Sequence, residues 1–125
     1  MQPSFFIRTD SRYTKIIFKD ILYAECRQNY VQIVMEGSKS YMALISMSQL
    51  ERTLPSQFFC RVHRSYIVSL NHVTSFNNDT IYIKDLPIPI SGEYKELLHR
   101  SVHILVSETR RKKPTVVNKN GELEP

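Results

Sequence analysis

The sequence predicts a mainly β protein with short-stranded antiparallel sheets, one short helix and one C-terminal amphipathic helix. Its 125 residues leave room for a single compact domain. Turn-forming residues interrupt the chain every few positions, and the segments between them are rich in β-branched and aromatic side chains. Only two segments have apolar residues at helical spacing, and the regular strand–helix alternation of a parallel sheet is absent from the pattern.

The predicted strands are short, and some pair as hairpins. The clearest hairpin lies at residues 30–45, where Val31, Ile33 and Met35 share one face and a turn at 36–39 precedes the returning strand. Pro87 and Pro89 cannot donate hydrogen bonds to a ladder, so we expect the last strand at a sheet edge. The predicted strands are residues 5–8, 13–18, 21–26, 30–36, 40–45, 58–61, 66–70, 72–76, 80–83 and 88–90.

Capping residues and apolar spacing predict the two helices. Ser46 and Gln49 have the spacing of a capping box, which would start a short helix that Pro55 ends. A longer amphipathic helix is expected from a Ser91 cap to about Thr109. Its apolar face would consist of Tyr94, Leu97, Leu98, Val102 and Leu105.

The end of the chain differs in composition from the rest. Residues 1–107 are predicted to form the domain, and residues 108–125 a flexible basic extension, because little apolar surface remains after Val117. The run Arg110–Lys113 is typical of a solvated charge run, and it could add non-specific phosphate contacts.

Charge and the amino terminus limit the partners and the location. The net charge of +5 makes a polyanion a plausible partner. Two cysteines are too few for a secreted disulfide framework, which favours a reducing cytoplasm. No signal-peptide pattern opens the sequence, and no apolar run approaches the ~18 residues of a membrane span. We therefore expect a cytoplasmic protein that does not bind membranes.

Catalytic motifs are not recognisable in the sequence. The three glycines lie far apart, so they cannot form a phosphate-binding loop. The GxSxG spacing of a nucleophile elbow does not occur either. The sequence predicts a protein that is not an enzyme and needs no cofactor.

A zinc-binding module is one alternative. Cys60 and His63 are three positions apart, and His99 and His103 would share one helix face. However, Arg100 follows His99 where a hydrolytic zinc helix carries a glutamate, and solvated histidines are common on a polar helix face.

Polar and basic residues gather in three connections between predicted strands. In such positions a rigid sheet can present them to a ligand. Arginine suits guanine edges or phosphates, asparagine and glutamine suit adenine, and serine suits phosphate oxygens, so these loops predict a DNA-binding surface. His63 could equally be a buried residue that stabilises a turn. The candidate residues are Arg27, Gln28, Asn29 and Tyr30 in the first cluster, Arg61, His63 and Arg64 in the second, and Ser91, Gly92 and Lys95 in the third.

Three motifs in the chain resemble the LytTR DNA-binding domain. The resemblance extends over residues 5–107, and the RVHRSYIV string at 61–68 is its most specific part. The motifs are Asp20–Glu25 followed by Asn29–Ile33, then Phe58–Phe59 with Arg61–Val68, and finally Ile88–Leu97.

The resemblance implies a mostly β output domain of bacterial transcription regulators, which inserts loops into successive major grooves of promoter DNA. It also implies tandem sites, a possible head-to-tail dimer on DNA, and a two-component receiver domain that is missing from this chain. The chain would then be either an excised output domain or a stand-alone regulator. Gly92 and Glu93 stand where the family often has a basic residue, which leaves a protein-interaction module without DNA binding as a further alternative.

Overall fold

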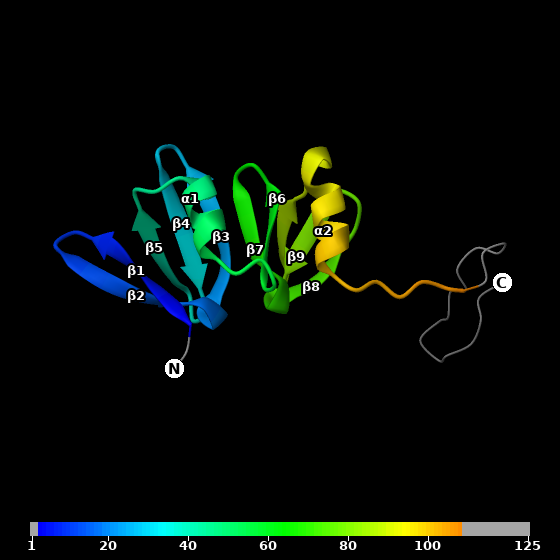
Figure 1. Cartoon of the computed structure of the whole chain (residues 1–125), viewed down its shortest axis with the longest axis horizontal. Helices are drawn as coiled ribbons and strands as arrows, with labels where there is room; N and C mark the ends of the chain where they lie inside the picture. Colours follow the sequence, from blue (N-terminus) through cyan, green and yellow to red (C-terminus); the bar gives the residue numbers. More distant parts are fainter. Residues whose placement is uncertain (1–2, 109–125) are drawn as a thin grey trace.

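The computed structural model describes residues 3–108, and these form three antiparallel sheets with short helices between them (Figure 1). The strands are β1 (Ser4–Thr9), β2 (Arg12–Ile17), β3 (Ile21–Arg27), β4 (Tyr30–Met35), β5 (Lys39–Ala43), β6 (Phe59–His63), β7 (Tyr66–Ser69), β8 (Val73–Phe76), β9 (Thr80–Ile83) and β10 (Leu86–Pro89). The α-helices are α1 (Met47–Thr53) and α2 (Lys95–Ser101), and the 3-10 helices are η1 (Phe18–Asp20), η2 (Leu70–His72) and η3 (Gly92–Tyr94).

A five-stranded sheet in the order β5-β4-β3-β7-β6 forms the centre of the molecule. Its central strand β3 pairs antiparallel with both β4 and β7, although β7 comes forty residues later in the chain. This non-local pairing brings the β3–β4 turn and the β6–β7 turn to the same end of the sheet.

The β1–β2 hairpin and α1 cover one face of the central sheet. Period-2 alternation in the strands directs every second side chain toward this layer. The resulting core includes Ile7 and Ile16 from the hairpin, Leu50 from α1, and Val31 and Ile33 from the sheet.

The β10-β9-β8 sheet and α2 pack on the other side, around β6 and β7. This second core joins Val62 and Val68 of the central sheet to Ile81, Ile88 and Leu98. The molecule is elongated, with one core on each face of the central sheet (Figure 1).

Most predicted elements are confirmed, including the mainly β class. The β4–β5 hairpin turns through Gly37 and Ser38, which both have positive φ angles of 81° and 64°. The Ser46 hydroxyl caps α1 by accepting a hydrogen bond from the Gln49 backbone N–H at 3.0 Å. The β10 strand, which carries both prolines, lies at the edge of its sheet as expected.

The prediction of one long C-terminal helix was wrong. The α2 helix ends at Ser101, and Val102 is already extended (φ −125°, ψ 161°). The sheet offers a partner only to the first turns, where Leu98 is fully buried, whereas Leu105 is 89% exposed. The apolar residues keep their helical spacing beyond the sheet surface that could bury them. Helices gain most of their stability from such burial, so the helix ends where that surface ends.

The predicted Ser91 N-cap is confirmed in position but not in its hydrogen bond. Ser91 precedes the 3-10 turn η3, which runs directly into α2, and the Ser91 side chain makes no capping hydrogen bond there. The expected basic extension lies outside the described residues from position 109 onward. Within residues 3–108, no helix combines the length and apolar character that crossing a bilayer requires.

Candidate nucleic-acid interface

The three predicted clusters lie along one edge of the molecule. In Figure 1 the β3–β4 turn, the β6–β7 turn and the start of α2 line its upper side. The Cys26 N–H donates to the Ser65 carbonyl at 2.9 Å, which links the first two turns. The Ser91 N–H donates to the Val62 carbonyl at 2.9 Å, which links the third connection to β6. We call residues 27–30, 63–65 and 91–95 together the loop edge.

The first connection is a two-residue turn. Arg27 pairs with Tyr30 across the hairpin, and Gln28 adopts a positive φ of 57° between them. The Arg27 side chain is exposed, and its Nη1 donates to the Gln32 side-chain oxygen at 3.0 Å. Gln28 and Asn29 are exposed at the tip, while Tyr30 is half-buried, so the turn presents one cation and two amides.

The second connection is also a two-residue turn, formed by Arg64 and Ser65. A bulge at Val62 shifts the register between β6 and β7, and it places His63 on the same face as Tyr66, whose ring lies 5.6 Å away. The His63 Nδ1 accepts a hydrogen bond from the Ser65 N–H at 3.0 Å. His63 therefore braces the turn, and the exposed Arg64 side chain extends from it.

The third connection carries a lysine where the first two carry arginines. Gly92 and Lys95 are both exposed, and a Cβ atom at Gly92 would meet nothing within 4 Å. The Ser91 Oγ, by contrast, is buried and has no hydrogen-bond partner among the described residues. Lys95 is the exposed cation of this connection, and Glu93 beside it is an exposed acid.

Arg61 differs from the other basic residues because it lies beneath the loop edge. Its side chain is 14% exposed, and Nη1 forms an ion pair with Glu51 of α1 at 3.1 Å. Its Nη2 donates to the Arg64 carbonyl at 2.6 Å, and its guanidinium lies 5.7 Å from the centre of the Tyr94 ring. These contacts occupy the guanidinium within the protein.

A polar cluster on the sheet face adjoins Arg27. The rings of Tyr23 and Tyr66 lie 6.5 Å apart. Burial raises the pKa of Tyr66, and the adjacent Glu25 carboxylate raises it further. Burial likewise raises the pKa of Tyr23, again with Glu25 contributing, while Arg27 acts in the opposite direction on both phenols. Both hydroxyl groups therefore stay neutral hydrogen-bond donors at physiological pH.

An open hollow of about 500 Å³ lies between the first two turns and the start of α1. Sequence reasoning missed the contribution of residues 44–49 to this surface, because the capping box there predicted a helix start and said nothing of its neighbours. The sequence carried no signal for it, because Leu44 fell inside the predicted strand 40–45, whereas the structure ends β5 at Ala43 and leaves Leu44 exposed. The hollow is lined on its other sides by Cys26, Gln28, Asn29, Arg61 and Arg64.

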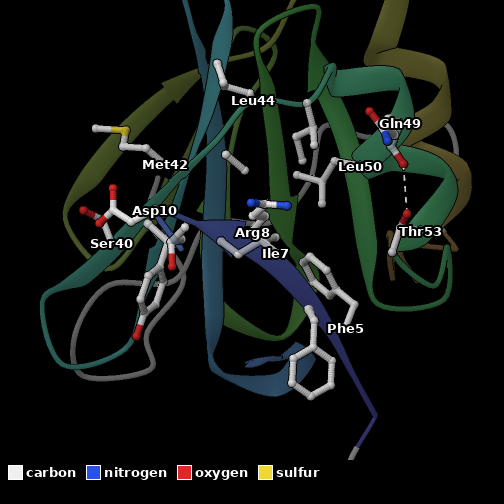
Figure 2. A pocket seen from close by; sticks show the side chains of 15 residues that line it. Phe5, Ile7, Arg8, Asp10, Ser40, Met42, Leu44, Gln49, Leu50 and Thr53 are labelled. Carbon is white, nitrogen blue, oxygen red and sulfur yellow. Dashed lines mark hydrogen bonds between the residues drawn. The ribbon is translucent and has the colours of Figure 1, made fainter. Parts of the chain in front are cut away.

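A second hollow, of about 880 Å³, lies between β1, β5 and α1 (Figure 2). Its walls are mostly apolar, with Phe5, Ile7 and Leu50 among them, and Arg8 and Asp10 are the charged residues that line it. One cation and one carboxylate do not make a phosphate site, so this hollow does not extend the charged surface of the loop edge.

The zinc alternative lacks the geometry that it needs. The α2 helix ends before His103, so His99 and His103 do not share a helix face. His99 instead packs edge-on against Phe76 at 5.9 Å, and burial raises the pKa of the Cys60 thiol. Among residues 3–108, no three His, Cys, Asp or Glu side chains are grouped so as to hold a metal ion.

The fold matches a known structure. A LytTr DNA-binding domain of a putative methyl-accepting/DNA response regulator from Bacillus cereus superimposes with a TM-score of 0.69, over 81% of this chain and 97% of that one. At 20% identity the match establishes the shared fold. The molecule therefore has the β-rich fold of that domain.

Sequence comparison identifies the family. Residues 11–103 match the family model of the LytTr DNA-binding domain, and the chain belongs to this family of DNA-binding domains. Two similar proteins are the sensory transduction protein LytT of Bacillus subtilis and the transcriptional regulatory protein YpdB of Escherichia coli. LytT is 33% identical over 69% of this chain, and YpdB is 32% identical over 72% of it. The matched regions are 38% of LytT and 41% of YpdB, so the chain spans about two fifths of these relatives.

Proposed function

We propose that the chain binds double-stranded promoter DNA sequence-specifically, by inserting turns of the loop edge into the major groove. The observation that carries this proposal is the alignment of three connections on one edge, each with an exposed basic residue: Arg27, Arg64 and Lys95. The family match supports DNA as the polyanion, and the similarity to a sensory transduction protein, LytT, and a transcriptional regulatory protein, YpdB, supports a role in regulated transcription.

The shape of the edge suits a groove better than a flat surface. Two-residue turns are the narrowest connections between antiparallel strands, and the major groove is about 12 Å wide, enough for a two-stranded ribbon. Adjacent turns tied by the Cys26–Ser65 hydrogen bond would enter together as one unit. The loops would thus replace a recognition helix.

We assign different tasks to the residues of the loop edge. Arg27 and Asn29 would read base edges, with Gln28 and Tyr30 beside them, because arginine and amide side chains pair bidentately with bases. Arg64 and Lys95 would contact phosphates and fix the register, with His63, Ser91 and Gly92 shaping the adjacent backbone.

The wider arrangement follows from the same proposal. We infer a bacterial cytoplasmic regulator of the two-component type, whose copies bind tandem sites as a head-to-tail dimer. A pair of half-sites on one face of DNA would place equivalent loops one helical turn apart.

Selection of bound duplexes from a random pool tests the proposal most directly. We expect one preferred motif, recovered as repeated half-sites, and fluorescence anisotropy should then give an affinity that falls steeply with salt because several phosphates are contacted. A pool without enrichment, together with affinity that salt does not change, would contradict DNA binding and favour a protein-interaction module.

A further inference from the structure

The guanidinium of Arg61 contacts three elements that sequence separates. Through Nη1 it reaches Glu51 on α1, through Nη2 the carbonyl of Arg64 in the β6–β7 turn, and through its face the ring of Tyr94 at the end of η3. The last two elements belong to the loop edge, and α1 lines the hollow beside it. Few single side chains could make these contacts, because only arginine combines a planar fork of donors with a face that stacks on aromatic rings.

Burial makes these contacts matter. A guanidinium that is 14% exposed depends on protein partners in place of water, and Arg61 Nε already has no acceptor in residues 3–108. Loss of Glu51 or of the Arg64 carbonyl would leave a charged group with still fewer partners. The side chain therefore favours the one arrangement in which α1, the turn and η3 are all in place.

We propose that Arg61 is a positioning residue: it holds the β6–β7 turn and η3 at a fixed spacing so that Arg64 and Lys95 meet DNA together, without touching DNA itself. This inference rests on the proposed function. It separates Arg61 from the exposed cations, which act on DNA directly, and it gives Glu51 a role in binding although a carboxylate near DNA would by charge alone oppose it.

Glu51 provides the sharpest test, because charge and positioning predict opposite results. Its side chain is 42% exposed and it lies on the surface of α1, so its replacement leaves the core intact. We expect Glu51→Ala to bind the selected duplex about tenfold more weakly, the scale of one charge-assisted hydrogen bond. Glu51→Gln should recover much of that loss, since an amide oxygen still accepts from Arg61. Binding by Glu51→Ala as tight as that of the unmodified chain, or tighter, would overturn the inference.

Two further variants separate positioning from direct contact. Arg61→Lys keeps the charge and loses the fork, so we expect about tenfold weaker binding of the selected duplex. Binding by Arg61→Lys as tight as that of the unmodified chain would mean that the charge alone suffices, as in a direct phosphate contact, which overturns the inference. Glu96→Ala is the matched control, because Glu96 is an exposed helix acid outside the loop edge, and its removal should leave affinity equal or higher.

The measurements use the full chain, with thermal unfolding recorded for each variant to confirm folding. If the unmodified chain binds DNA and Glu51→Ala binds equally well, this inference fails and the proposed function stands. If the unmodified chain shows no salt-dependent binding at all, the proposed function fails, and the inference fails with it.

Discussion

Charged side chains form ion pairs at one end of the central sheet, whereas the exposed cations at the other end have no carboxylate partner within residues 3–108. At the end away from the loop edge, the Glu36 carboxylate lies 3.2 Å from His72 Nδ1 and 3.7 Å from Lys84 Nζ, and His72 Nε2 lies 3.0 Å from the Lys19 carbonyl. At the loop edge, the described part of the chain supplies no ion-pair partner for Arg27, Arg64 or Lys95.

The difference separates charges that stabilise the fold from charges that are available to a partner. Glu36, His72 and Lys84 come from the β4–β5 turn, η2 and the β9–β10 turn, so their contacts join the central sheet to the β10-β9-β8 sheet. The cations of the loop edge have no carboxylate partner among the described residues, and Arg27 donates only to the neutral Gln32 side chain, so their charge is available to an anionic partner.

The largest expected effect is that of Arg27→Ala. Loss of a base-reading arginine should cost about 1 to 3 kcal/mol on the preferred duplex and relax the preference at one base position. Anisotropy titrations of preferred and scrambled duplexes measure both quantities. Lys95→Ala serves as the comparison, because it should weaken all sequences similarly and lower the salt slope by about one unit. Equal losses on preferred and scrambled DNA for both variants would refute the division of tasks.

Glu36→Gln tests the opposite end of the sheet. The ion pairs of Glu36 are part-exposed, so we expect the free energy of unfolding to fall by about 0.5 to 1 kcal/mol in urea denaturation. DNA affinity should stay the same, because the six residues of β4, about 20 Å of strand, separate Glu36 from the loop edge, and charges beyond the Debye length of about 8 Å are largely screened. A change in affinity larger than the change in stability would show that the two ends are not independent.

The smallest expected effect is a gain. Gly92→Arg adds a cation to the third connection, where the new Cβ meets nothing within 4 Å and the backbone φ is not positive. We expect a few-fold tighter binding to all duplexes and a salt slope steeper by about one unit. Gly92→Gln, of similar reach and no charge, is the control, and an equal gain from both would assign the effect to something other than charge.

Elements were predictable from sequence where a local pattern of side chains shows which residues will be buried or will cap a helix. Alternation in β4 and the capping box at Ser46 are local signals, and the structure agrees with both. The end of α2 was not predictable, because the apolar spacing from Tyr94 to Leu105 does not reveal that the sheet surface ends near Ser101.

The three connections of the loop edge were recognisable in the sequence, whereas their contacts with DNA and the separate roles of their residues stay predictions. All three connections could be found from their composition, and the resemblance supported them. Sequence did not separate Arg61 from Arg64, because the distinction depends on Glu51, ten residues earlier on α1, and on Tyr94, far along the chain. In the sequence, Arg61 and Arg64 are two arginines of one short basic segment. Only the packing of α1, the β6–β7 turn and η3 around Arg61 buries one of them and leaves the other exposed.

The brevity of the two hairpin turns has a consequence for how such a domain changes its target in evolution. A two-residue turn between paired strands cannot lengthen without shifting its ladder, and Cys26 and Ser65 tie the two turns to each other. New preferences should therefore arise by exchanging side chains on an unchanged backbone, at Arg27, Gln28, Asn29 or Arg64. Relatives with divergent binding motifs should accordingly differ at these positions and keep the lengths of both turns.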